Sequence, residues 1–300
     1  MSSILLLIVC LALGVIVART AKPSPVLAQS LNWWVLNVAL SALVLHLIPK
    51  LQFEWHLWFL IASMWFVFLG AWALFALLGR ALHWTRARIG ALTLVCGLGN
   101  TSFIGFPLIE ALRGQEGLTY ALIADQAGCF IALAVGGTIV AALYSGGTVT
   151  TTAIARKVLW FPPFISLIAG AIVGAFGGWP DTVDDMLSRI GATLVPLALF
   201  SVGLQFRLRF EHGLMRAIGA GLAWKLALAP LLVYVAGAAL GVSSGVLTIS
   251  VLESAMAPMV SATILAEQND LEPPLANTVL GAGIVLSFAT VPLANYLLGV

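Results

Sequence analysis

Two polar runs, each ending in a proline, interrupt apolar stretches of this sequence. The first extends from Gly99 to Pro107 and places an amide and two hydroxyl side chains beside its first glycine. The second extends from Glu253 to Pro258 and begins with a carboxylate. Proline removes a backbone donor from a helix, so we expect each run to open the helix and free its peptide groups. A new half-helix is expected beyond Pro107 and another beyond Pro258, and the free N–H groups at such a helix start can hold a carboxylate, whereas free carbonyl groups can hold a small cation.

Three ionisable residues, Asp125, Lys225 and Glu253, lie well inside apolar stretches. Charge is costly in hydrocarbon, so each is a functional candidate. Glu253 could hold a cation together with freed carbonyl groups, carry a proton, or be a protonated acid bonded to a neighbouring backbone group. Asp125 could complete a cation site with Asn100 and Thr101, relay protons with Glu253, or serve as a polar packing partner. Lys225 is expected to extend its long stem toward the cytoplasmic side. Otherwise it pairs with one of the acids or attracts an anion.

The composition indicates which elements must position these groups. Of the 300 residues, 61% are hydrophobic and 9% are charged, which is too apolar to cover a surface in water. Long continuous apolar runs favour helices that cross a lipid bilayer. No basic groove suggests a nucleic-acid partner, and no nucleophile, P-loop or zinc-hydrolase motif suggests an enzyme. We therefore expect no enzymatic activity and no cofactor other than a coupling ion.

Ten apolar runs are long enough to cross a bilayer. They lie near residues 2–19, 31–49, 56–79, 89–112, 117–144, 157–178, 184–205, 213–240, 244–266 and 274–299. The connections 1–2, 3–4, 5–6 and 7–8 contain ten of the 14 basic residues: Arg19, Lys22, Arg80, Arg86, Arg88, Arg156, Lys157, Arg207, Arg209 and Arg216. Basic connections stay in the cytoplasm, so we expect both termini to lie outside.

The two halves of the sequence repeat one another. Gly14-Val15-Ile16-Val17 matches Gly170-Ala171-Ile172-Val173, Leu51-Gln52-Phe53 matches Leu204-Gln205-Phe206, and Pro107 matches Pro258, at offsets of 156, 153 and 151 residues. Each half contains five spans, an odd number, so the second half must run through the membrane in the opposite sense. The sequence therefore predicts two inverted five-helix repeats, residues 1–150 and 151–300, with spans 4 and 9 broken.

The first polar run resembles a known family. Residues Gly97 to Leu108, with the sequence GLGNTSFIGFPL, resemble the fourth span of the auxin efflux carrier family. The Ala257–Pro258 pair and the ten-span layout are similar to that family too, so the resemblance covers the whole chain. The short connection between spans 5 and 6 resembles the prokaryotic members, which are linked to malonate, malate and similar carboxylates, whereas plant members export auxin.

The family is in turn similar to bile acid–sodium symporters, and the resemblance implies their architecture. Spans 1, 2, 6 and 7 would form a panel domain, and spans 3, 4, 5, 8, 9 and 10 a core domain in which two broken helices cross at mid-membrane. The resemblance also implies Na⁺ at Glu253, with carbonyl ligands from Ser254, Met256 and Ala257. Auxin carriers generally lack this glutamate and are described as uncoupled or proton-linked, so H⁺ is the alternative.

These observations predict an all-α, polytopic membrane protein that acts as a secondary active transporter. It would move a small organic anion, auxin-like or a dicarboxylate, by alternating access, coupled to Na⁺ or H⁺. An uncoupled uniporter or channel for such anions is the alternative function. We expect the protein in the inner membrane of a bacterium, in contact with lipid, where a panel facing the lipid could support a homodimer.

The predicted site residues form two groups. The substrate-binding residues would come from both breaks and from span 10: Asn100, Thr101, Ser102, Phe103, Gly105, Phe106, Pro107, Ala257, Pro258, Met259, Ser261 and Asn277. The coupling ion would be held by Glu253, Asp125, Asn100, Thr101, Ser254 and Met256.

Overall fold

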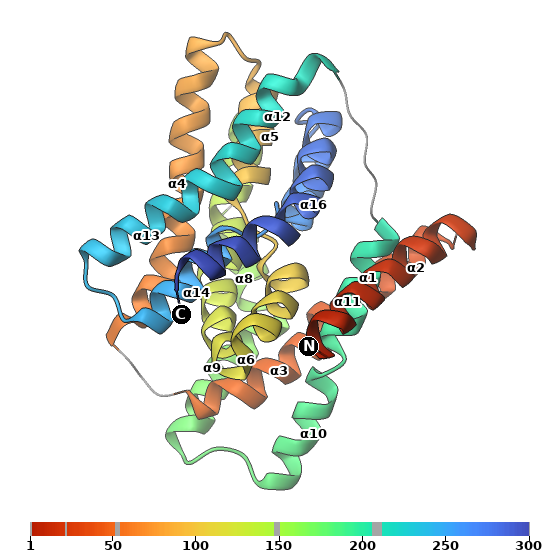
Figure 1. The fold of residues 1–300 in the computed structure, drawn as a ribbon, viewed down its shortest axis with the longest axis vertical. Coiled ribbons are helices and arrows are strands. Elements are labelled where there is room, and N and C mark those ends of the chain that lie inside the picture. Colours follow the sequence, from red (N-terminus) through yellow and green to blue (C-terminus); the bar gives the residue numbers. More distant parts are fainter. Residues whose placement is uncertain (1, 22, 52–54, 147–150, 206–211, 300) are drawn as a thin grey trace. The chain divides into compact units, whose positions relative to one another are not determined.

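A computed structural model describes residues 2–21, 23–51, 55–146, 151–205 and 212–299 of the chain (Figure 1). Within those ranges the secondary structure is helical, with an isolated β-bridge and no strand. This confirms the predicted all-helical class. Some residues used in the topology and repeat predictions lie outside the described ranges: Lys22, Gln52, Phe53, Phe206, Arg207 and Arg209.

The chain forms two compact units, each assembled from separate stretches of sequence. Unit 1 contains Met1–Glu54, Ser102–Leu122 and Arg156–Phe206, and unit 2 contains Trp55–Thr101, Ile123–Ala155 and Arg207–Val300. The predicted inverted repeats, and the predicted division into panel and core domains, stay predictions. Each unit is described separately below.

In the described part of unit 1, the helices pack in two groups. Its helical segments are α1 (Ser2–Thr20), α2 (Pro25–Trp34), η1 (Val35–Ala39), α3 (Leu40–Leu47), η2 (Ile48–Lys50), α6 (Phe106–Ile123), α9 (Pro162–Ala175), α10 (Asp181–Gly191) and α11 (Leu194–Gln205). The last residue of α6, Ile123, belongs to unit 2. Helix α1 packs along α11, and α3 packs against both α9 and α10.

Glycines allow these helices to approach closely. A Cβ atom on Gly14 of α1 would lie 2.3 Å from the carbonyl oxygen of Phe200, and one on Gly203 of α11 would lie 2.4 Å from that of Leu11. A Cβ on Gly170 of α9 would lie 3.2 Å from the Cβ of Ile48. Small residues at such crossings let backbones meet where lipid supplies no hydrophobic drive for association.

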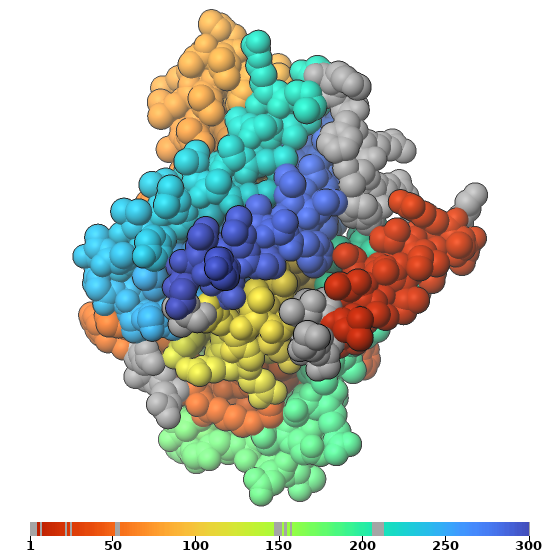
Figure 2. Space-filling view, in the orientation of Figure 1, coloured from red at the N-terminus to blue at the C-terminus, as the bar shows by residue number. Residues whose placement is uncertain are grey.

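Unit 2 is built around two interrupted helices. It contains η3 (Trp55–Leu57), α4 (Trp58–Ala81), α5 (Arg86–Gly97), η5 (Ala124–Cys129), η6 (Ala132–Gly137), α7 (Thr138–Ser145), η7 (His212–Leu214), α12 (Met215–Ala223), η8 (Trp224–Leu228), α13 (Ala229–Ala239), α14 (Ser244–Ser254), α15 (Val260–Gln268) and α16 (Pro273–Leu297). Helix α4 packs on α5, η5 and α14. The space-filling view shows α12 lying beside α16 (Figure 2). The segment η4 (Thr101–Gly105) begins in unit 2 and continues in unit 1, and α8 (Thr151–Leu159) also crosses the division.

Six helical stretches in the described ranges are long and apolar enough to cross a membrane: Val26–Lys50, Trp55–Ala81, Thr101–Ser145, Asp181–Gln205, Met215–Ala239 and Pro273–Leu297. The apolar helices Ile8–Thr20, Pro162–Ala175 and Ser244–Ser254 are shorter. The 45-residue stretch contains a kink at Gly114, whose φ of 67° and ψ of −163° are not helical, between the predicted spans 4 and 5. A multi-pass helical protein is therefore supported, whereas the count of ten spans stays a prediction.

Candidate functional site

Two extended segments of unit 2 cross and bind one another. Gly99 and Pro258 form an antiparallel β-bridge. The N–H of Asn100 donates to the carbonyl oxygen of Ala257 at 2.7 Å, and the N–H of Met259 donates to that of Leu98 at 3.1 Å. The breaks after α5 and after α14 therefore satisfy part of each other's backbone. Peptide groups outside a helix need such partners at membrane depth.

The local sequence explains why both helices end here. Helix α5 ends at Gly97, and Leu98 is extended with φ −116° and ψ 133°. Helix α14 ends at Ser254, and α15 starts at Val260, after the proline that cannot continue a helix. A Cβ on Gly283 of α16 would lie 2.2 Å from the Cδ of Pro258, so the absence of a side chain there leaves room for the proline ring.

The two prolines differ in their positions relative to the breaks. Pro258 lies within its break, as the sequence predicts. The first break instead spans Leu98–Asn100, and helical structure resumes at Thr101 in η4. Pro107 is the second residue of α6, which continues directly from η4, so helical structure passes through this proline. The expectation that a new half-helix begins beyond Pro107 is therefore wrong.

Lys225 lies against both breaks. It belongs to η8, is 1% exposed, and its Nζ donates to the carbonyl oxygen of Ser254 at 2.8 Å. A Cβ on Gly99 would lie 3.1 Å from this Nζ and 3.3 Å from the carbonyl oxygen of Glu253. The expected extension of Lys225 toward the cytoplasmic side is wrong, because its ammonium group ends inside unit 2.

Asp125 is held beside the first break by neighbouring donors. This residue of η5 is buried, and its carboxylate accepts hydrogen bonds from the Thr101 hydroxyl and from the Gln126 side-chain amide. One turn later, the Sγ of Cys129 donates to the carbonyl oxygen of Gly99 at 3.5 Å. Two donors on one carboxylate favour its ionised form. Sequence reasoning did not assign roles to Gln126 and Cys129 in this site.

Glu253 presents a buried carboxyl group on the last turn of α14. Its side chain is 0% exposed, and among the described residues neither carboxyl oxygen has a hydrogen-bond partner. The same holds, within the described part of the chain, for the Oγ of Ser250 and the Oε1 of Gln126. Asp125 and Lys225 interact with Glu253 electrostatically. Two acids and one base therefore share the interior of unit 2 at the crossing.

The other predicted site residues fall in three places. Asn100, Met256 and Ala257 are buried at the crossing, and Ser261 is half-buried in the first turn of α15. Asn277 is exposed and donates to Glu267 and, at 3.0 Å, to the carbonyl oxygen of Pro273, so its contacts belong to the connection between α15 and α16. The remaining residues belong to unit 1: Ser102, Phe103, Gly105, Phe106 and Pro107.

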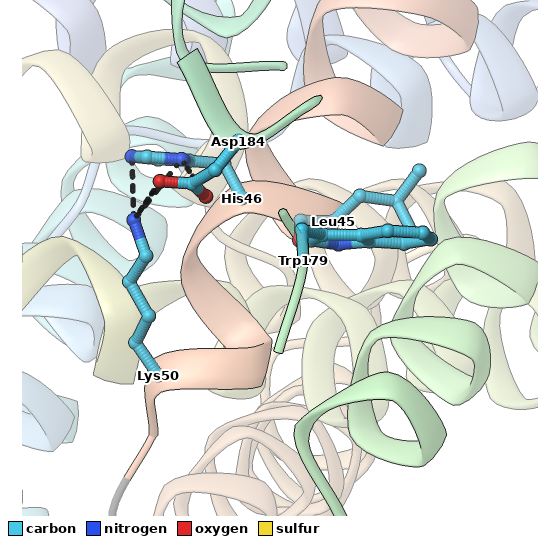
Figure 3. A network of polar contacts seen from close by, with 5 residues as sticks. All are labelled: Leu45, His46, Lys50, Trp179 and Asp184. Atoms are coloured by element: carbon cyan, nitrogen blue, oxygen red, sulfur yellow. Dashed lines mark hydrogen bonds and ion pairs between the residues drawn. The ribbon is translucent and has the colours of Figure 1, made fainter. Parts of the chain in front are cut away.

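Unit 1 contains a cavity and a polar cluster of its own. The cavity of about 270 Å³ is lined by Pro107, Glu110 and His46, among other residues. Figure 3 shows the cluster, in which the carboxylate of Asp184 contacts the Nδ1 of His46 at 2.8 Å and the Nζ of Lys50 at 2.7 Å. The indole N–H of Trp179 donates to the carbonyl oxygen of Leu45 at 2.8 Å. These contacts connect α10 and the segment before it to α3 and η2.

Comparison with known proteins gives the chain a family context. Residues 1–294 match the family described as "Membrane transport protein". An uncharacterized transporter of Methanothermobacter thermautotrophicus is 26% identical over 226 residues, which cover 73% of each chain. An uncharacterized transporter of Methanocaldococcus jannaschii is 33% identical over 121 residues, which cover 39% of this chain and 38% of the relative.

Proposed function

Because this chain belongs to the auxin efflux carrier family of membrane transport proteins, we propose that it is a secondary active transporter for a small organic anion. The family consists of transporters and not of enzymes. The observation that carries the proposal is the crossing of Gly99 and Pro258, which opens two helices beside the buried ammonium of Lys225. Interrupted helices at matching positions of two halves are typical of secondary transporter sites.

The chemistry of the crossing favours an anionic substrate. Helix α15 begins two residues after Pro258, and the first N–H groups of a helix carry partial positive charge. Lys225 adds a full positive charge on the other side of the break. A carboxylate at this position would meet donors without requiring the protein to bury a new counter-charge. Binding must stay moderate, because a carrier also has to release its substrate.

The inverted-repeat architecture is part of the proposal. In the predicted inverted repeat, span 1 is equivalent to span 6, span 2 to span 7, and span 4 to span 9. The packing of α1 on α11 would then correspond to the packing of α9 on α3, and both contacts use a glycine, Gly14 in one and Gly170 in the other. The bridge between Gly99 and Pro258 joins predicted spans 4 and 9, which are equivalent to each other in this repeat. These correspondences support two repeats, 1–150 and 151–300, and alternating access as the mechanism.

We further propose that a coupling ion, Na⁺ or H⁺, binds near Glu253 and Asp125, and that the protein is a bacterial inner-membrane protein with both termini outside. A homodimer within the bilayer is also part of this proposal. The alternative is an uncoupled uniporter or channel. Anion flux that ignores imposed Na⁺ and H⁺ gradients would favour the alternative.

Uptake into proteoliposomes tests the proposed function. Labelled dicarboxylates and indole acids are offered separately, under an inward Na⁺ gradient, an inward H⁺ gradient, or neither. We expect saturable uptake of at least one anion, accelerated by one gradient, and no uptake of a matched neutral amide. Equal rates in protein-containing and empty liposomes for every anion would contradict the proposal.

A further inference from the structure

We propose that Lys225 is the resident cation of the crossing and that it occupies the place a sodium ion would take, so that the crossing binds no sodium ion. This inference rests on the proposed function, because it excludes one of the two coupling ions proposed for the same site. It starts from the contact that the sequence did not predict, between the Nζ of Lys225 and the carbonyl oxygen of Ser254.

The carbonyl group of Ser254 is the ligand that Lys225 contacts. The last carbonyl groups of a helix form the negative end of its dipole. Ser254 is the last residue of α14, and its carbonyl group is one of the expected ligands of a coupling cation. The structure places an ammonium group 2.8 Å from this oxygen. The ammonium group of Lys225 therefore already binds a carbonyl oxygen that a free cation would need as a ligand.

The ammonium group of Lys225 also occupies the space beside Gly99. A Cβ on Gly99 would lie 3.1 Å from the Nζ of Lys225, so the ammonium group fits close against a residue without a side chain. The whole lysine is 1% exposed. A sodium ion in the same place would have to displace the ammonium group, and a sodium ion next to it would be repelled by a like charge in a medium of low dielectric constant.

Ionisable groups of three elements face Lys225. Glu253 faces it from α14, Cys96 from α5 and Cys129 from η5, while Asp125 of η5 interacts with Glu253. The ammonium group therefore supplies the positive charge that a sodium ion would otherwise bring to the two acids.

The alternative is a purely structural lysine, in which Lys225 only satisfies the end of α14. That role predicts a loss of stability in any Lys225 variant but no change in ion preference. The proposal predicts a change in ion preference, and this difference can be measured without knowing the substrate.

The first experiment measures sodium binding to the purified protein in detergent. Replacing choline with 150 mM Na⁺ should leave the Tm of the wild type and of Lys225→Arg unchanged. Lys225→Ala should show a Na⁺-dependent rise in Tm of about 3 °C or more, because sodium can then occupy the vacated carbonyl site. Lys50→Ala is the matched control, since Lys50 is half-exposed in unit 1. A Tm rise in the wild type, or none in Lys225→Ala, would overturn the proposal.

If Lys225→Ala does not fold, the proposal can still be tested on the wild type. Binding of radioactive ²²Na⁺ to the wild type, measured in a scintillation proximity assay, decides the same point. We expect no saturable signal, and a saturable signal competed by unlabelled Na⁺ would overturn the proposal.

The second experiment uses the anion identified by proteoliposome uptake. Wild-type uptake should be unaffected by an inward Na⁺ gradient. Stimulation of wild-type uptake by Na⁺ would overturn the proposal. A wild type that transports no anion would contradict the proposed function instead, while the sodium-binding result would still decide the role of Lys225.

Discussion

The Nζ of Lys225 donates a 2.8 Å hydrogen bond to the carbonyl oxygen of Ser254, at the end of a helix that is broken by a proline four residues later. This contact brings a full positive charge to the place where the backbone is least regular. It also ties the middle of a third helical stretch to the crossing of the other two. Changes at the crossing should therefore affect ion preference, substrate affinity and packing separately.

Pro258→Ala should lower substrate affinity at least 10-fold, whereas Pro107→Ala should change it less than 2-fold. Pro258 lies in the break, whereas Pro107 lies in helical structure that continues from η4 into α6, so only the first change can promote a continuous helix through a break. The measurement is KM for uptake in proteoliposomes. Equal effects of the two substitutions would show that the break after α14 has no special part in binding.

Gly283→Val should destabilise the protein by about 1–3 kcal/mol, as overpacking in a buried site does. A Cβ there would lie 2.2 Å from the Cδ of Pro258, so either α16 or the break must shift. The matched control is Gly219→Val, because a Cβ on Gly219 of α12 would meet nothing within 4 Å. Thermal unfolding in detergent measures both. A Tm for Gly283→Val as high as that of the control would refute the close contact.

Thr101→Val should reduce uptake about 10-fold, whereas Thr101→Ser should retain it. The Thr101 hydroxyl donates to the buried carboxylate of Asp125, and hydrogen bonds to charged groups contribute about 1.5–3 kcal/mol. Serine keeps the donor, while valine keeps the shape and removes it. Initial rates at saturating substrate measure the effect. Normal rates in the valine variant would mean that the contact has no part in transport.

Asp184→Asn should lower stability by no more than about 1 kcal/mol and should leave uptake unchanged. The side chains of Lys50 and Asp184 are 52% and 24% exposed, and water screens such pairs strongly. The cluster with His46 lies in unit 1 (Figure 3), and the crossing lies in unit 2. Parallel Tm and uptake measurements check both statements. A large loss of uptake with normal stability would give this cluster a functional role that we do not assign to it.

Much of the crossing could be predicted from the sequence, because glycine, proline and polar side chains together disfavour a continuous helix inside an apolar span. The two polar runs and the three intramembrane ionisable residues all point to the part of the chain where Gly99 meets Pro258. The all-helical class follows equally directly from composition.

The direction of Lys225 could not be predicted, for a physical reason. Helical periodicity assigns each residue to a face only if the helix is a regular α-helix. Lys225 lies in the π-helical turn η8, which contains more residues per turn and so shifts the face to which the following side chains point. The position of the first break differs from its prediction for a related reason. Proline usually interrupts the interior of a helix, but here helical structure runs from the π-helical turn η4 through Pro107 into α6, and that turn changes the hydrogen-bond pattern just before the proline.

Asp125 and Thr101 were expected as possible ligands of one cation, and the structure instead shows that Thr101 donates to Asp125. The second donor, Gln126, was not expected. Adjacent residues normally point to different faces of a helix, so nothing in the spacing suggested that Gln126 would bond to Asp125. The six-residue π segment η5 contains both residues and alters that relation.

The most direct test of the central claim is a cryo-EM map of the protein with its transported anion bound. We predict non-helical density at Leu98–Asn100 and Ala255–Met259, and anion density against the crossing of Gly99 and Pro258. Continuous helical density through either segment, or an anion bound without contact to the residues of the crossing, would contradict it.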